Sequence, residues 1–291
     1  VDVFLITPTY EWQFAPQVED ADFTKIAKKA GLGPEVARLL FERGIQDQES
    51  LKKFLEPSLE DLHDPYLLHD MDKAVARIRQ AIEEGENILI YGDYDADGMT
   101  SASIVKESLE QLGAECRVYL PNRFTDGYGP NASVYKYFIE QEGISLIVTV
   151  DNGVAGHEAI ELAQSMGVDV IVTDHHSMPE TLPDAYAIVH PEHPDADYPF
   201  KYLAGCGVAF KLACALLEEV QVELLDLVAI GTIADMVSLT DENRILVQYG
   251  LEMLGHTQRI GLQEMLDMAG IAANEVTEET VGFQIAPRLN S

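Results

Sequence analysis

The sequence has few cysteines and no long apolar run. Cys116, Cys206 and Cys214 lack Cys-x-x-Cys spacing and are too few for a disulfide scaffold or a zinc site, so we expect reduced core thiols. No run of apolar residues is long enough to cross a bilayer, and the first residues lack the basic and apolar regions of a signal peptide. We therefore expect a cytoplasmic protein that does not associate with membranes.

Basic residues are also scarce. The chain has 19 Lys or Arg against 50 Asp or Glu, a net charge of −31. Proteins that bind nucleic acid usually carry a basic patch, so this balance argues against long-range attraction to DNA. Bound metal ions, a narrow basic groove or a segment outside this chain could offset the acidity locally.

The order of apolar segments indicates an α/β fold. With 291 residues, 47% of them hydrophobic, the chain can bury a sizeable core. Short apolar runs alternate with helical patterns, which is typical of a parallel sheet with helices on both faces. We predict a five-stranded sheet, with strands near 87–92, 115–120, 145–150, 168–173 and 185–190 and helices near 99–112, 131–142 and 155–166.

Three regions are expected along the chain. Amphipathic stretches broken by Pro57 and Pro65 predict a small helical extension over 1–70. The α/β domain should occupy 71–235, and further helices should fill 236–291. Because the chain starts at Val1 and stops just after a motif-like segment, we expect a fragment of a longer protein.

The most informative segment joins an apolar strand to three aspartates. Asp93, Asp95 and Asp97 follow Ile88–Tyr91, and such closely packed carboxylates favour a bound divalent cation. An EF-hand would need a preceding helix and a Glu at its twelfth position, which here is Ile104. A polar turn with Asp97 as a helix N-cap is the structural alternative.

Two further strands end in similar residues. Asp151 follows the run at 144–150, and Asp174, His175 and His176 follow the run at 168–173. The carboxyl ends of parallel strands lie at one edge of the sheet, so these side chains should converge. Imidazoles also suit transition metals better than calcium or magnesium. Asp235 closes a buried run at 224–234, a position that by itself favours a structural role.

These segments together resemble the four motifs of the DHH phosphoesterase superfamily. The motifs are DYDADG at 93–98, VDNG at 150–153, DHH at 174–176 and GTIAD at 231–235. The stretches PNRFTDGYG at 121–129, AGCGVAFK at 204–211 and PRLN at 287–290 resemble the RecJ-type single-stranded-DNA exonucleases. Tyr91 and Asp93 stand where the small-substrate phosphodiesterases and pyrophosphatases usually have a histidine, which also favours the RecJ branch.

The resemblance implies a two-metal site for manganese, with magnesium as a substitute. By carry-over, one ion would be held by four residues: Asp97, Asp151, His175 and Asp235. The second would be held by Asp95 and the shared Asp151, with help from Asp93, which is also a candidate catalytic residue. Two such ions can activate water and stabilise the attacking and leaving oxygens of a phosphodiester.

Other residues receive roles from the same resemblance. His176 would donate a hydrogen bond to the scissile phosphate or, alternatively, support a ligand. Asp174 would orient His175 or the strand turn. Arg123 would contact nucleic acid near its 5′ end, or else pair with Asp126. The remaining candidates are Arg288 and Asn290 as phosphate contacts, and Gly205 and Gly207 as a helix start that approaches a phosphate or allows close packing.

These interpretations predict a metal-dependent phosphodiesterase. The resemblance favours a 5′-to-3′ exonuclease that releases mononucleotides from single-stranded DNA in repair and recombination, working beside a single-stranded-DNA-binding protein or a helicase. Members of that family carry a second domain beyond this point, with the active cleft between the two domains. The alternatives are a short-oligonucleotide or cyclic-dinucleotide phosphodiesterase, a pyrophosphatase, or a non-catalytic replication or scaffold relative.

Overall fold

The chain contacts divide the molecule into two compact units, Val1–Glu56 and Pro57–Ser291. The computed structural model describes residues 21–122, 125 and 127–291. In the described residues of the first unit, three helices pack around a small core that includes Phe23, Ala27 and Leu51; they are α1 (Ala21–Lys29), α2 (Pro34–Glu42) and α3 (Gln48–Leu55). These helices lie in the region where amphipathic stretches of the sequence predicted a helical extension. The division into 1–70, 71–235 and 236–291 remains a prediction.

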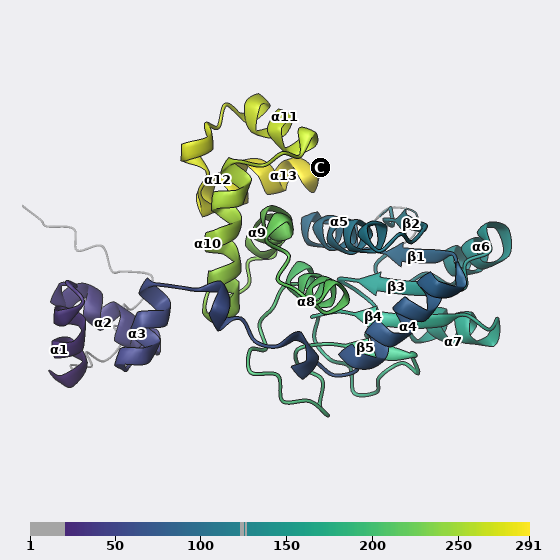
Figure 1. The fold of residues 1–291 in the computed structure, drawn as a ribbon, viewed down its shortest axis with the longest axis horizontal. Helices are drawn as coiled ribbons and strands as arrows, with labels where there is room; N and C mark the ends of the chain where they lie inside the picture. Colours follow the sequence, from purple (N-terminus) through teal and green to yellow (C-terminus); the bar gives the residue numbers. More distant parts are fainter. Residues whose placement is uncertain (1–20, 123–124, 126) are drawn as a thin grey trace, which may run out of the picture. The chain divides into compact units, whose positions relative to one another are not determined.

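A single parallel sheet organises the second unit (Figure 1). Its strand order is β2-β1-β3-β4-β5, and every neighbouring pair is parallel. The strands are β1 (Ile88–Tyr91), β2 (Cys116–Tyr119), β3 (Leu146–Val150), β4 (Asp169–Thr173) and β5 (Ala187–Val189). Each lies within the range predicted for it, so the predicted α/β architecture is confirmed.

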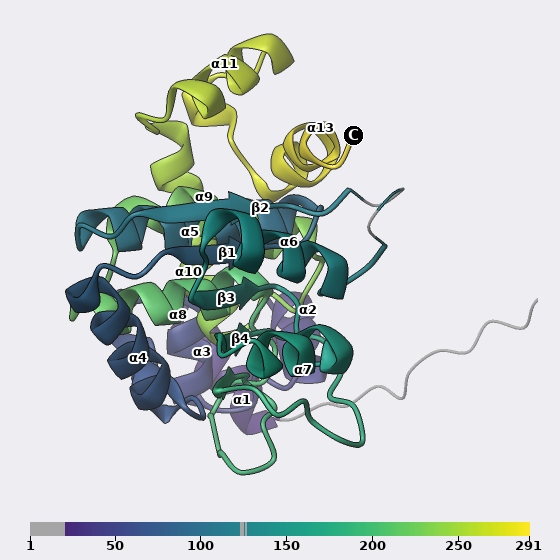
Figure 2. The same ribbon diagram turned by 90° about the vertical axis from the view of Figure 1, so that its right-hand side faces the viewer.

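Helices cover both faces of this sheet (Figure 2). Side chains alternate between faces along a strand, so Ile88 and Ile90 pack in one core while Leu89 and Tyr91 pack in the other. The first core is closed by α4 (Met71–Glu84), α5 (Ala96–Gln111) and α8 (Gly205–Leu217). The second is closed by α6 (Ala132–Glu142) and α7 (His157–Ser165). Burial on both faces explains the continuously apolar strand sequences.

Helix α5 begins three residues before the predicted helix at 99–112. Asp95 has extended backbone angles, and its side chain accepts a hydrogen bond of 3.0 Å from the backbone N–H of Gly98. This geometry makes Asp95 the N-cap. The alternative that placed Asp97 at the cap is therefore wrong, and Asp97 lies inside the first helical turn.

The remaining helices follow the sheet or connect it to the first unit. Helix α9 (Leu225–Ala234) is buried along nearly its whole length and ends at Asp235, as predicted.

Among the residues that the structure describes, every helix is too short or too polar to cross a bilayer. The other segments are η1 (Leu59–Asp61), η2 (Pro65–Leu67), η3 (Val222–Leu224), α10 (Asp241–Gly255), α11 (Ile260–Ala269), η4 (Ala273–Glu275), α12 (Glu278–Thr280), the π-helical η5 (Val281–Ile285) and α13 (Ala286–Leu289).

A buried ion pair links α8 to α10. Lys211 and Glu242 contact each other and are 2% and 0% exposed. Glu242 also accepts hydrogen bonds from the Tyr198 hydroxyl and the His63 backbone N–H, and Lys211 donates to the His63 carbonyl. Removing one member of such a pair leaves the other charge buried and uncompensated.

We expect Lys211→Met to lower the free energy of unfolding by about 3–5 kcal/mol. Denaturant titration followed by circular dichroism measures this change. The exposed Lys136, whose pair with Glu140 spans 3.9 Å, provides the matched control; Lys136→Met should change stability by less than about 1 kcal/mol. Equal effects of the two substitutions would contradict the proposed importance of the buried pair.

Candidate metal centre

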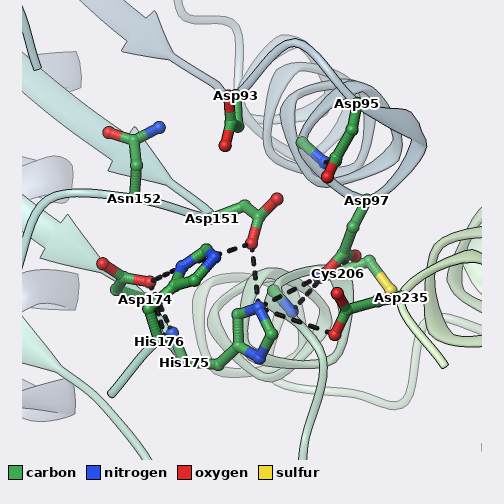
Figure 3. Close-up of polar contacts among 12 residues, drawn as sticks. Asp93, Asp95, Asp97, Asp151, Asn152, Asp174, His175, His176, Cys206 and Asp235 are labelled. Carbon is green, nitrogen blue, oxygen red and sulfur yellow. Dashed lines mark hydrogen bonds and ion pairs between the residues drawn. The ribbon is translucent and has the colours of Figure 1, made fainter. Parts of the chain in front are cut away.

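The carboxyl ends of β1, β3 and β4 bring the predicted acidic and imidazole side chains together (Figure 3). Three overlapping groups have one ligand atom from each member within 4.8 Å of the others. The groups are Asp97 with His175 and Asp235, Asp93 with Asp95 and Asp151, and Asp151 with His175 and His176. The structure thus places all six predicted metal-ligand residues at one site, with Asp151 and His175 each belonging to two groups.

His175 lies at the centre of the first group. Its Nε2 is 3.0 Å from Asp151 Oδ1, 3.7 Å from Asp97 Oδ2 and 3.8 Å from Asp235 Oδ2. Within the described part of the chain, this Nε2 and Asp151 Oδ1 are both buried and neither makes a hydrogen bond. Buried polar atoms are rarely left without partners, so this donor set fits a cation bound between them.

Asp151 adopts a conformation that is unusual for a residue with a side chain. Its φ of 60° lies in the left-handed region, and the following Gly153 has φ 124°. Asn152 holds this turn. Its side-chain amide donates to the backbone carbonyls of Tyr91 and Val150, while its backbone carbonyl accepts from the Thr149 hydroxyl. Strain of this kind persists where the surroundings enforce it, commonly at functional sites. The turn thereby fixes the Asp151 carboxylate between β1 and β4.

The start of helix α8 supports Asp97. Its two carboxylate oxygens accept the backbone N–H groups of Gly205 and Cys206, at 2.7 Å and 2.8 Å. A helix N-terminus favours negative charge, so these contacts hold the carboxylate in place. Gly205 therefore approaches a carboxylate, whereas the sequence suggested a phosphate. A Cβ added at Gly207 would meet the Leu203 side chain, four residues earlier in the same segment.

We expect Gly205→Ala to reduce manganese affinity and activity together, by about tenfold or more. An added Cβ would lie 2.5 Å from Asp151 Oδ1 and 2.6 Å from Asp151 Cβ, so this carboxylate must move. Manganese titration and steady-state hydrolysis measure the two effects. Gly207→Ala is the control, since its Cβ would meet only the Leu203 side chain, at 3.2 Å or more. A Gly205→Ala protein with unchanged manganese affinity would refute this role.

Asp174 orients His176. Its Oδ1 lies 2.8 Å from His176 Nδ1 and accepts the backbone N–H groups of His175 and His176, while Oδ2 accepts that of Val154. The prediction that it orients the His175 ring is wrong, whereas its predicted role in the strand turn agrees with these contacts. Burial acts to raise the pKa of Asp174, but the hydrogen bond and charge of His176 outweigh it and lower that pKa. The same hydrogen bond raises the pKa of His176.

Sequence reasoning missed the contribution of His190. This fully buried ring lies at the end of β5, with Nε2 2.8 Å from the His176 carbonyl and Nδ1 accepting the Glu192 backbone N–H. The two contacts assign a neutral ring that donates to the backbone of the DHH segment. Only its position at the end of a predicted strand could have suggested this role.

The remaining predicted residues lie around the cluster or outside the described residues. Asn290 Oδ1 accepts the Ala96 backbone N–H at 2.7 Å, so Asn290 reaches the start of α5. Beside it is a cavity of about 590 Å³, lined in part by Tyr94, Asp95 and Asn290. Arg288 is exposed and donates to the Gln284 carbonyl. Arg123 and its alternative partner Asp126 fall among residues that the structure does not describe.

Three carboxyl groups in the cluster have raised pKa values. Burial, followed by the charge of Asp95, raises the pKa of Asp93 to about 6. Burial and the charge of Asp97 raise the pKa of Asp235 to about 6 and that of Asp151 well above its usual value. A bound cation would replace the protons that these groups otherwise retain.

The raised pKa values predict how manganese changes thermal stability. Without metal, the folded protein binds these protons more tightly than the unfolded chain, so this contribution to stability is present below pH 4 and is lost as pH rises through about 6. We expect manganese to raise the melting temperature more at pH 8 than at pH 5, because at pH 5 it competes with bound protons. Differential scanning fluorimetry measures both increments. Equal increments, or a larger one at pH 5, would contradict this expectation.

Comparisons with known proteins agree with this geometry. The family model described as "DHH family, N-terminal domain" matches residues 87–232. The single-stranded-DNA-specific exonuclease RecJ of Bacillus subtilis is 48% identical over 99% of this chain and 36% of its own length. RecJ of Escherichia coli is 39% identical over 90% of this chain and 48% of its own. This chain therefore spans between a third and a half of these relatives.

Solved structures extend the likeness to the fold. RecJ from Thermus thermophilus in complex with Mn²⁺ superimposes with a TM-score of 0.76 at 33% identity, covering 92% of this chain and 38% of the other. An exonuclease RecJ bound to manganese gives a TM-score of 0.71 at 36% identity over 80% of this chain and 58% of the other. The motifs, the sheet and the converging ligands lead to one conclusion: the chain belongs to the DHH family and is similar in sequence and fold to the RecJ proteins.

Proposed function

We propose that this chain is the metal-binding part of a manganese-dependent phosphodiesterase that acts on single-stranded DNA from its 5′ end. One observation carries the proposal. Asp151 Oδ1 and His175 Nε2 are buried without a hydrogen bond and lie 3.0 Å apart among several carboxylates. The RecJ relatives, named for their action on single-stranded DNA, supply the substrate class. Repair and recombination in the cytoplasm, beside a single-stranded-DNA-binding protein or a helicase, would be the setting.

The residues divide into two sets of ligands. Asp97, Asp151, His175 and Asp235 would hold one ion, while Asp95, Asp151 and Asp93 would hold the other. Manganese fits the mixture of imidazole and carboxylate ligands. Magnesium prefers oxygen ligands, so it could replace manganese by binding mainly to the carboxylates. When bound, the ions would supply an activated water and charge for the attacking and leaving oxygens.

His176 performs a separate task at this site. Asp174 occupies its Nδ1, so Nε2 is the nitrogen left to meet the substrate. The raised pKa of the ring favours the protonated form, which can donate to a non-bridging phosphate oxygen. Arg288, Asn290 and Arg123 would contact phosphates farther along the strand, and Asn290 already lies at the start of α5.

The acidic surface supports a second candidate, a phosphodiesterase for short oligonucleotides or cyclic dinucleotides. Residues 57–291 carry 12 Lys or Arg and 40 Asp or Glu. Many of these cations are already paired with acids; Arg77, Arg79, Arg117 and Arg259 are examples. A substrate of few phosphates needs less basic surface than a long strand does.

One parallel assay distinguishes the two candidates. The longest natural form of the protein is given manganese with 5′-labelled single-stranded DNA, a 5′-phosphorylated dinucleotide, a cyclic dinucleotide or pyrophosphate. We expect immediate release of labelled mononucleotide from the long strand. Turnover of only the small substrates would replace the leading candidate with the second one. Absence of manganese-dependent hydrolysis in every reaction would reject both.

A further inference from the structure

Tyr128 lies against His176 but has no part in either set of metal ligands. It belongs to the segment between β2 and α6, and its ring meets that of His176 edge to face, with centroids 5.8 Å apart and planes at 83°. Tyr128 is nevertheless 60% exposed. An accessible aromatic residue therefore stands beside the histidine that is proposed to meet the substrate phosphate.

Two glycines and a buried tyrosine hold Tyr128 in this position. Gly127 and Gly129 have φ values of 80° and 76°, in the left-handed region that glycine adopts at little cost. The hydroxyl of the fully buried Tyr91 donates to the Gly129 carbonyl at 3.1 Å, which ties the segment to the end of β1. The backbone therefore turns on both sides of Tyr128, and a residue of the sheet fixes where the ring is presented.

The hydroxyl of Tyr128 faces the carboxylates of the metal centre. Burial raises its pKa, and so do the negative charges of four aspartates: Asp93, Asp174, Asp151 and Asp95. These carboxylates follow β1, β3 and β4, so the hydroxyl lies within electrostatic reach of all three strand ends. Because the pKa is raised, the phenol keeps its proton and remains a donor. Within the described part of the chain this hydroxyl has no hydrogen-bond partner, so its proton is available to a bound molecule.

A neutral donor suits the charge balance of this part of the molecule. Residues 57–291 carry 12 Lys or Arg against 40 Asp or Glu, so few cationic side chains are on hand to hold an anion. A hydrogen bond to an ionised oxygen is stronger than one between neutral groups. A phenol makes such a bond without bringing a charge that must itself be compensated. Tyr128 thus has the chemistry to hold a phosphate group where basic side chains are scarce.

We propose that the Tyr128 hydroxyl donates a hydrogen bond to a phosphate oxygen of the bound substrate, beside His176. This inference rests on the proposed phosphodiesterase function and adds a substrate-contacting residue to it. His176 would meet one phosphate oxygen through Nε2, and Tyr128 would meet a neighbouring one. The edge-to-face contact of the two rings keeps the two donors together. A ring that instead stacked on a nucleobase would need its aromatic face and not its hydroxyl, so the two roles respond differently to substitution.

Tyr128→Phe tests the hydroxyl while keeping the ring against His176. With manganese present, we expect kcat/KM to fall about 10- to 100-fold on whichever substrate the wild-type protein hydrolyses, and manganese affinity to stay unchanged. Tyr137→Phe is the matched control, because Tyr137 on α6 is 53% exposed and meets Phe138 edge to face, with centroids 5.5 Å apart. The control protein should hydrolyse at the wild-type rate.

A binding measurement tests the same contact without hydrolysis. Calorimetric titration with thymidine 5′-monophosphate and manganese should show about tenfold weaker binding to Tyr128→Phe than to wild type, with a similar loss for inorganic phosphate. Tyr128→Leu, which also removes the ring, should bind about as weakly as Tyr128→Phe. Circular dichroism shows whether each variant is folded.

The possible results separate this contact from the proposed function. Equal nucleotide affinity in wild type and folded Tyr128→Phe, or a loss seen only in Tyr128→Leu, would overturn the hydrogen bond; the second result would assign the ring to stacking. Absence of nucleotide binding by the wild-type protein would overturn it as well. A wild-type protein that binds the nucleotide, loses affinity on Tyr128→Phe and hydrolyses no substrate would reject the proposed function and support the contact.

Discussion

Asp151→Ala should abolish hydrolysis with either manganese or magnesium. The carboxylate would serve both proposed ions, since Asp151 belongs to the group with Asp93 and Asp95 and to the group with His175. Loss of a residue that only supports a ligand costs about 10- to 100-fold, so loss of a shared ligand should exceed about 100-fold. Calorimetric titration with manganese should show that at least one of two sites is lost. The rate of mononucleotide release measures the effect on activity.

The same substitution should not damage the fold. Asp151 is buried at high cost when charged, as its raised pKa shows, and relief of that cost should offset the strain of an alanine at its φ of 60°, so the metal-free protein should stay folded. Asp72→Ala is a suitable control, because Asp72 is an exposed aspartate in the first turn of α4. It should keep full activity. An Asp151→Ala protein that still hydrolyses DNA at the wild-type rate would refute the shared-ligand assignment.

His176→Ala should separate catalysis from metal binding. We expect kcat to fall by about 100- to 1,000-fold, the usual cost of removing one donor that stabilises developing charge. Manganese affinity should change little, because His175 and the carboxylates remain. Single-turnover kinetics and manganese titration on the same protein measure both quantities. If His176→Ala binds one manganese ion fewer, the residue is itself a ligand.

Asp174→Asn should change the pKa of His176 while keeping its ring in place. The carboxylate raises the pKa of His176 through their hydrogen bond, so its neutralisation should lower that pKa. The protonated ring would then be lost at lower pH, and the alkaline limb of the pH–rate profile should move toward acid. Asp184→Asn, a substitution in the loop between β4 and β5, is the comparison. An unshifted profile in a folded Asp174→Asn protein would argue that the ring acts in its neutral form.

Much of the fold and the cluster could be predicted because local pattern and topology agree. Three apolar runs end in Asp93, Asp151 and Asp174, and parallel pairing of β1, β3 and β4 brings these ends to one edge. Asp235 was a weaker prediction, since it comes from the end of a helix. Where that helix end lies depends on the packing of α9 against α5, α8 and α10.

The features that escaped prediction depend on contacts between distant segments. Nothing near Asp151 in sequence reveals its left-handed backbone, which Asn152 stabilises by reaching back to Tyr91. Likewise, the hydrogen bond from His190 to the His176 carbonyl spans 14 residues and joins the segments that follow β4 and β5. The Asp97 carboxylate is supported by amides more than 100 residues away. Such partners require the tertiary fold.

The support of Asp97 by the first amides of α8 also bears on how a substrate could enter the centre. Each of its oxygens accepts one N–H, so each keeps one further lone pair that could meet an ion. An ion held by these few side chains would keep exchangeable water in its remaining positions. Phosphate oxygens of a substrate could then displace this water without displacing a side chain from the ion. The protein could thus bind and release substrate while it keeps the ion.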